Sequence, residues 1–139
     1  MATQAQGTSV SANYLSPVRR IRAVVADDSP DMQRVIAWIL ERDGLVDVVG
    51  TADTGSMAIA LTEAMAPDLV VLDVNMPVMN GFEAALLIKK SSPETKILIV
   101  SSDDNPDLGL CAIDCGADGF LWKSNLLREC KSRIERIFE

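Results

Sequence analysis

Apolar and polar positions follow two alternating patterns along the chain from residue 21 onward. Short runs of apolar, often β-branched residues are typical of buried strands, and five such runs occur at residues 21–26, 46–50, 69–72, 97–100 and 119–122. The segments between and after them repeat apolar residues every three or four positions, which indicates amphipathic helices. Five helices are therefore predicted, beginning near residues 30, 55, 81, 107 and 125.

The same helical period predicts which residues face the core. In the first helix the predicted buried face consists of Met32, Val35, Ile36, Ile39 and Leu40. In the second it consists of Met57, Ala60, Leu61 and Ala64. In the last it consists of Leu126, Leu127, Cys130, Ile134 and Ile137. Pro30 suits the first turn of the first helix, and Asn125 is a predicted N-cap of the last one.

The predicted strands are apolar throughout rather than alternately apolar and polar. This pattern is typical of a parallel sheet covered by helices on both faces. Five strands that alternate with five helices indicate an open, doubly wound α/β fold. In such folds ligands bind beyond the carboxyl ends of the strands, so the polar residues that follow the strands are the candidates for a functional site.

Charged and hydroxyl side chains stand at the ends of four predicted strands. Asp27 and Asp28 follow the first strand, Asp73 the third, Ser101 the fourth and Lys123 the fifth. If these strands are neighbours, three carboxylates meet in one small cleft, where their mutual repulsion raises their pKa values. A hard divalent cation such as Mg²⁺ removes that cost because it prefers oxygen ligands. The ammonium group of Lys123 and the hydroxyl of Ser101 suit phosphate oxygens, so this set favours phosphoryl transfer onto a carboxylate.

Single residues of this set also have plainer interpretations. Asp27 and Asp28 could cap the following helix, since Asp is a preferred N-cap residue. Ser101 alone is weak evidence, because serine ends many strands, and Lys123 could be a surface lysine. The site interpretation prevails because the acids and the lysine occupy matching strand ends.

Composition and charge narrow the chemistry further. The chain has 139 residues, 20 acidic and 13 basic side chains and no histidine. It therefore has no Ser-His-Asp or Cys-His catalytic group of its own and cannot carry a phosphohistidine. The first 22 residues hold three arginines and no acid, which leaves a body with 10 basic and 20 acidic side chains, a net charge of −10. Such a body repels nucleic acid phosphates, so direct nucleic acid binding by this domain is not expected.

The N-terminal part differs from the rest of the chain. Residues 1–20 are rich in Ala, Ser, Thr and Gln and have no amphipathic period, which predicts a flexible leader before a domain at residues 21–139. No apolar run reaches membrane-spanning length and no signal peptide is evident. We therefore expect a cytoplasmic protein with no membrane association.

Four segments together resemble the response-regulator receiver domain of two-component signalling. They are VVADDSP at residues 24–30, LVVLDVNMPVMNGFE at 69–83, ILIVSSDD at 97–104 and GADGFLWKS at 116–124. The resemblance implies a flavodoxin-like (βα)5 fold with strand order 2-1-3-4-5. The GADGF lead-in and the Lys-Ser pair look closest to receivers of the helix-turn-helix transcription-factor branch, although no output domain follows before Glu139.

The resemblance also implies roles for individual residues. Asp73 would accept a phosphoryl group from a sensor histidine kinase or a histidine phosphotransfer protein. Asp28, Asp73 and the backbone carbonyl of Asn75 would ligate Mg²⁺ or Mn²⁺, with Asp27 acting through water. Ser101 and Lys123 would bind the phosphoryl group.

The resemblance implies that a second group of residues would respond to phosphorylation of Asp73. Ser101 and Phe120 would act as switch residues. Asn75 and Asp103 would flank the attacking water and tune dephosphorylation over minutes. The switch would alter the surface around helix 4, strand 5 and helix 5, and so control a downstream output protein or a phosphorylation-dependent homodimer. Such a protein is not an enzyme in the usual sense, since it catalyses only its own aspartyl phosphorylation and dephosphorylation.

The sequence departs from the family pattern at two positions. Ser124 replaces the proline that often follows the lysine corresponding to Lys123. The peptide bond between Lys123 and Ser124 is therefore expected to be either trans or a strained cis bond, which costs ~2.5–4 kcal/mol. Ser101 replaces a threonine.

Three alternative functions are considered. A hydrolase of the haloacid dehalogenase kind would need an acid two residues after Asp73, where Asn75 stands. A nucleotide- or flavin-binding domain would need a glycine-rich phosphate motif that the chain lacks, and a degenerate receiver would lack site residues that are present here.

Overall fold

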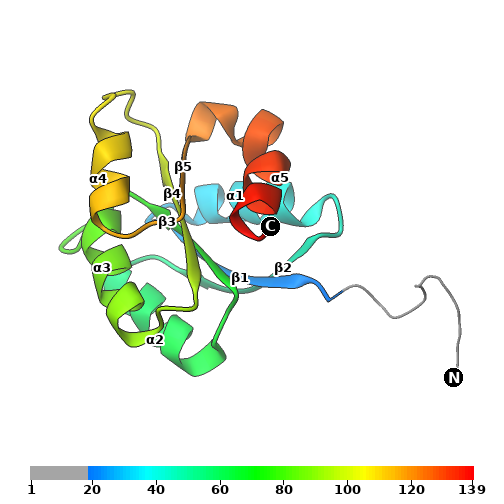
Figure 1. The fold of residues 1–139 in the computed structure, drawn as a ribbon, viewed down its shortest axis with the longest axis horizontal. Helices are drawn as coiled ribbons and strands as arrows, with labels where there is room; N and C mark the ends of the chain where they lie inside the picture. The colour runs from blue at the N-terminus through cyan, green and yellow to red at the C-terminus, as the bar shows by residue number, and fades with distance from the viewer. Residues whose placement is uncertain (1–18) are drawn as a thin grey trace, which may run out of the picture.

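The computed structural model describes residues 19–139, and the predicted leader lies outside this range except for Arg19 and Arg20. The strands are β1 (Ile21–Ala26), β2 (Val46–Ala52), β3 (Leu69–Asp73), β4 (Lys96–Ser101) and β5 (Gly119–Trp122). The helices are α1 (Pro30–Glu41), α2 (Gly55–Met65), α3 (Gly81–Ser91), α4 (Leu108–Asp114) and α5 (Leu126–Ile137), with a 3-10 turn, Lys123–Asn125, before the last. Strands and helices therefore alternate as predicted (Figure 1).

The five strands form one parallel sheet in the order β2-β1-β3-β4-β5. Successive residues of each strand point to opposite faces, and both faces are covered. Val70 and Leu72 belong to a core beneath α2, α3 and α4, whereas Leu69 and Val71 belong to a core beneath α1 and α5. All four are fully buried, which explains why β3 is apolar at successive positions rather than at alternate ones. The predicted doubly wound fold and its strand order are confirmed.

Local capping fixes where two of the helices begin. Ser29 precedes α1, and its side chain accepts a hydrogen bond from the Met32 N–H. Asn80 and Glu83 form a reciprocal capping box at the start of α3. Each cap satisfies N–H groups that the first helical turn leaves free. Because α1 and α3 follow the two strands that carry the acids, these caps also fix the loops around the candidate site.

The predicted face of α2 is wrong at three of its four positions, since only Leu61 is partly buried against the core. Met57, Ala60 and Ala64 are exposed, and the buried positions are instead Gly55, Ala58 and Thr62. This helix is apolar on most sides, so its period does not define a unique face. Small side chains are the ones that allow close packing, and the Thr62 hydroxyl is satisfied by donating to the Ala58 carbonyl at 2.7 Å.

Three smaller predictions about α1 and α5 also fail, the third of them in part. Val35 is 48% exposed and Leu127 is 52% exposed, so each lies outside the buried face of its helix. Asn125 occupies the predicted N-cap position of α5, but the expected capping hydrogen bond is missing, and its side chain accepts from Arg128 instead. Among residues 19–139, no helix combines the length and the apolarity needed to cross a lipid bilayer.

Candidate functional site

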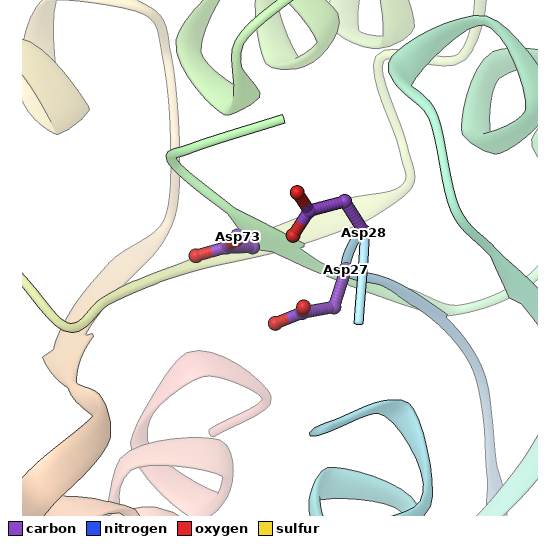
Figure 2. Close-up of side chains that lie close together, drawn as sticks. All are labelled: Asp27, Asp28 and Asp73. Carbon is purple, nitrogen blue, oxygen red and sulfur yellow. The ribbon is translucent and has the colours of Figure 1, made fainter. Parts of the chain in front are cut away.

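Three aspartates meet at the carboxyl ends of β1 and β3. These strands are direct neighbours, with Ala26 paired to Leu72, so the residues that follow them lie side by side (Figure 2). Each of Asp27, Asp28 and Asp73 offers a carboxylate oxygen, and these oxygens lie within 4.8 Å of one another. The convergence predicted from the strand ends is therefore present.

The three acids differ in exposure. Asp27 and Asp73 are only 1% and 3% exposed, whereas Asp28 faces solvent. A buried carboxylate is stable only when hydrogen bonds or opposite charges compensate for its lost hydration. The contacts of Asp27 and Asp73 therefore decide what the site can do.

Asp27 is fully held by its surroundings. Its Oδ1 accepts a hydrogen bond from the Ser29 N–H at 2.9 Å, and its Oδ2 accepts one from Lys123 Nζ at 2.7 Å. Its backbone is fixed as well, because Gln33 Nε2 donates to the carbonyls of Asp27 and Ala52 at 2.7 and 3.1 Å. Sequence reasoning missed Gln33, since a glutamine in the first turns of a helix gives no signal of such a role.

Asp73 is held less completely. Lys123 Nζ forms an ion pair with its Oδ1 at 3.2 Å, longer than the 2.7 Å to Asp27, and this buried oxygen accepts no hydrogen bond of good geometry. Within residues 19–139, Lys123 is the one cation that contacts the cluster. The two buried carboxylates thus share one ammonium group, and Asp73 Oδ1 lacks a hydrogen bond.

The electrostatics of the cluster follow from this imbalance. Burial, and after it the charge of Asp27, raises the pKa of Asp73 above its ordinary value, and Lys123 offsets only part of this. Burial alone would lower the pKa of Lys123, but its hydrogen bond to Asp27 and the charges of both acids raise it. Lys123 therefore stays protonated at neutral pH, and added positive charge near Asp73 would favour its ionised form.

A glycine allows the loop after Asp73 to turn closely over the strand. The Gly81 N–H donates to the Val74 carbonyl at 2.9 Å. A Cβ atom at Gly81 would lie 2.3 Å from the Asp73 carbonyl oxygen, so any other residue would force the backbone apart. Asn75 is exposed in this loop, two residues after Asp73. Its predicted roles as a carbonyl ligand and in dephosphorylation stay predictions.

The other predicted residues lie around the cluster but do not bond to it. Ser101 is buried, and its Oγ accepts a hydrogen bond from the Asp103 N–H at 3.0 Å. Phe120 is half-buried and packs edge-to-face on Trp122, with ring centroids 5.0 Å apart. The peptide bond between Lys123 and Ser124 is trans, the first of the two predicted alternatives, since no cis bond occurs in the described part of the chain.

Comparison with known proteins identifies the family. Residues 23–135 match the family described as the response regulator receiver domain. The chain belongs to this family. The resemblance inferred from the strand-end motifs is thereby confirmed, and the observed strand order is the one that it implied.

Individual relatives support the same assignment. The protein named "Probable transcriptional regulatory protein NarL" of Mycobacterium tuberculosis is 36% identical over 110 residues, which cover 79% of this chain and 51% of the relative. A protein-glutamate methylesterase/protein-glutamine glutaminase of Haloarcula marismortui is 47% identical over 105 residues, 74% of this chain and 28% of the relative. This receiver domain thus spans about half, or less, of the length of these relatives.

A solved structure agrees with the fold. The receiver domain of the response regulator NarL from Mycobacterium tuberculosis superimposes with a TM-score of 0.77 at 32% identity, covering 86% of this chain and 98% of that domain. Because the aligned part is an isolated receiver, the similarity concerns this domain and not the remaining regions of the longer relatives.

Proposed function

We propose that this receiver domain accepts a phosphoryl group on Asp73 and works as a phosphorylation switch. The observation that carries the proposal is the unsatisfied Oδ1 of Asp73, which is buried at a strand end beside Lys123. Asp27 cannot take the same role as readily, because both of its oxygens already accept hydrogen bonds. Asp73 is thus the carboxylate with an oxygen free to form a new bond.

The acid cluster fits a divalent cation. Asp28, Asp73 and the backbone carbonyl of Asn75 would hold Mg²⁺ or Mn²⁺, with Asp27 acting through water; the three carboxylates offer oxygens within 4.8 Å of one another. Hard oxygen ligands are those that Mg²⁺ prefers, and it keeps part of its own hydration shell. When bound, the ion would offset the negative charge of the carboxylates and of the phosphoryl oxygens.

The transfer itself needs a donor outside this chain, which has no histidine. A carboxylate oxygen of Asp73 forms a bond to phosphorus, and the bond from phosphorus to the donor imidazole nitrogen breaks, so that the electron pair leaves with the imidazole. Lys123, protonated because of its raised pKa, then pairs with a phosphoryl oxygen. The donor is a sensor histidine kinase or a histidine phosphotransfer protein.

The response to phosphorylation spreads from the cluster to β4 and β5. Ser101 turns its hydroxyl to the phosphoryl group, and Phe120 adjusts in the neighbouring strand. The altered surface around α4, β5 and α5 then controls a downstream output protein or a homodimer in the cytoplasm. On this proposal the domain catalyses only its own phosphorylation and dephosphorylation and does not itself bind nucleic acid.

Phosphorylation with acetyl phosphate and Mg²⁺ tests the proposal. A phosphate-affinity gel should retard the wild-type chain and leave an Asp73→Asn variant unshifted. Asp68→Asn is a matched control, since Asp68 precedes β3 whereas Asp73 ends it; this variant should shift like the wild type. An unshifted wild type, or an equal shift in Asp73→Asn, would refute the assignment.

The lifetime of the phosphoryl group tests the roles of Asn75 and Asp103. Both residues are polar and exposed, so they leave water access to phosphorus, and we expect hydrolysis within minutes. Replacing both with larger apolar residues should lengthen the half-life measured on the same gel. A half-life that stays unchanged in the double variant would argue against their role.

A phosphohydrolase activity of the haloacid dehalogenase kind is not favoured. That chemistry needs a proton donor two residues after the nucleophile, and the amide of Asn75 cannot supply one. We expect no turnover of p-nitrophenyl phosphate.

A further inference from the structure

Trp122, the last residue of β5, is bonded to the loop that follows β4. Its indole Nε1 donates a hydrogen bond to the Asp103 carbonyl at 3.0 Å. The bond joins two segments that are 19 residues apart in sequence and that adjoin residues of the proposed function, since Trp122 precedes Lys123 and Asp103 comes two residues after Ser101. Nothing in the proposed function uses this bond.

The backbone of Asp103 is held on both sides. Its N–H donates to Ser101 Oγ at 3.0 Å, and its carbonyl receives the Trp122 indole. Ser101 Oγ also donates a long hydrogen bond, 3.4 Å, to the Asp103 carbonyl. In the conformation described here, Ser101 and Trp122 together fix the loop of residues 102–107.

A hydroxyl has only one proton to donate. If Ser101 gives that proton to a phosphoryl oxygen on Asp73, its weak contact with the Asp103 carbonyl is lost. The indole of Trp122 is then the one remaining side-chain donor to this carbonyl among the described residues. Whether the loop of residues 102–107 moves when Ser101 turns to the phosphoryl group therefore depends on the strength of the hydrogen bond from Trp122.

Trp122 also contacts Phe120, the predicted switch residue. Their rings meet edge-to-face, with centroids 5.0 Å apart and an interplanar angle of 88°. Such a contact depends on ring orientation. A change in the indole position would therefore reach Phe120 without any other intermediary.

We propose that Trp122 is a positioning residue that latches the β4–α4 loop in its resting conformation through Asp103, and that phosphorylation of Asp73 releases this latch. The second half of the proposal rests on the proposed function. The first half concerns the resting domain alone and can be tested without any phosphoryl group.

The substitution Trp122→Phe tests the latch in the resting domain. It removes the indole donor but keeps an aromatic ring against Phe120. Hydrogen exchange of the hydrogen-bonded loop amides, those of Asp103, Asn105 and Asp107, should become faster by about 2- to 10-fold, the effect expected from losing one hydrogen bond. Trp38→Phe is the matched control, because Trp38 is the second of the two tryptophans and is 62% exposed on α1, on the opposite face of the sheet. Equal exchange in both variants would overturn the latch.

The release is tested with beryllofluoride, which mimics the phosphoryl group, in the presence of Mg²⁺. A latch that favours the resting state opposes activation, so Trp122→Phe should lower the beryllofluoride concentration at half-saturation by about 2- to 10-fold. A purely structural role would leave or weaken this affinity. In the wild type, the nuclear magnetic resonance signal of the Trp122 indole N–H should shift on activation while that of Trp38 stays in place.

The outcomes separate the two proposals. An unmoved Trp122 signal in a domain that is saturated with beryllofluoride would refute the release and leave phosphorylation of Asp73 intact. A domain that takes neither beryllofluoride nor acetyl phosphate would refute the proposed function, whereas the exchange experiment would still decide the resting latch.

Discussion

Aspartates lie at both ends of the sheet, but their carboxylates have different hydrogen-bond and ion-pair partners. At the amino end, Asp68 precedes β3, and each of its oxygens has a partner. Oδ1 accepts from Arg19 Nη2 and Oδ2 from the Arg22 N–H, both at 2.9 Å. Asp118 precedes β5, and its Oδ2 accepts from Lys89 Nζ at 2.8 Å and from the Ile97 N–H at 2.9 Å. These acids tie strands and helices together.

At the carboxyl end the balance is reversed. Three aspartates meet there, and the two buried ones, Asp27 and Asp73, share Lys123. One buried oxygen of Asp73 lacks a hydrogen bond. An unsatisfied buried acceptor costs about 1–3 kcal/mol, so a fold retains one only where something else is gained. The comparison teaches that satisfied acids build the structure, whereas unsatisfied acids mark where a cation and a new covalent bond can be accepted.

A search for the functional site by cavity size would select the amino end of the sheet rather than the carboxyl end. A hollow of about 440 Å³ lies at the amino end, where Arg19, Glu63, Asp68, Lys96 and Phe138 are among its lining residues. Its aspartate is already paired, so the hollow offers no unsatisfied acid. The chemistry of the side chains, rather than the volume of the hollow, identifies the site.

The largest expected effect comes from breaking the carboxyl-end cluster. Lys123→Met leaves two buried carboxylates without their cation, and we expect a loss of roughly 3 kcal/mol in unfolding free energy at pH 7, measured by urea denaturation. The loss should shrink at pH 4, because the raised pKa of Asp73 lets that carboxylate take up a proton as the pH falls. Lys89→Met at the amino end is the control; Asp118 keeps the Ile97 N–H there, so its loss should be smaller. Equal, pH-independent losses would contradict the comparison.

A smaller effect is expected from breaking the amino end. Asp118→Ala removes the acceptor for Lys89 and for the Ile97 N–H, which should cost about 2 kcal/mol of stability. Labelling of the folded variant by acetyl phosphate should match that of the wild type. Loss of labelling in a variant that is folded by circular dichroism would show that the two ends are not separable in this way.

The smallest effect has the opposite sign. Asp73→Asn removes a buried charge and should stabilise the domain by about 1 kcal/mol at pH 7. The raised pKa of Asp73 means that the native state holds a proton which the unfolded state has already lost. Wild-type stability should therefore fall as pH rises from about 4 through this raised pKa.

The gain in Asp73→Asn should disappear below the ordinary Asp pKa of 3.8, where both states are protonated. Thermal melts of the two proteins across this pH range measure the difference. Asp68→Asn, which weakens a satisfied acid, should instead lose stability at pH 7. An advantage of Asp73→Asn that is the same at every pH would rule out the buried charge as its cause.

Much of the fold could be predicted because the sheet is buried on both faces. Continuous apolar runs identify all five strands, and the polar residue after each run predicts which side chains meet. The face of α2 could not be predicted, because a helix that is apolar on most sides has no informative period; only its packed neighbours select Ala58 and Thr62 for burial.

The candidate site was predictable to the same extent. The meeting of Asp27, Asp28 and Asp73 follows from the adjacency of β1 and β3, whereas Lys123 reaches them with its long side chain from the end of β5, beyond β4. The unequal satisfaction of Asp27 and Asp73 does not follow from strand order, because it depends on where one ammonium group lies between two carboxylates, 2.7 Å from the first and 3.2 Å from the second. The bond from Trp122 to Asp103 joins a strand to a loop through tertiary packing, so no local sequence pattern signals it.

Calorimetric titration with Mg²⁺ tests the central claim most directly. Asp28 is the best probe, because it is the exposed member of the cluster and its replacement should not disturb the core. We predict that the wild type and Asp68→Asn bind one Mg²⁺ per chain with equal affinity, and that Asp28→Asn binds it at least about 10-fold more weakly, as expected when a ligand is lost. Absence of saturable binding to the wild type, or equal affinity in Asp28→Asn, would contradict the account.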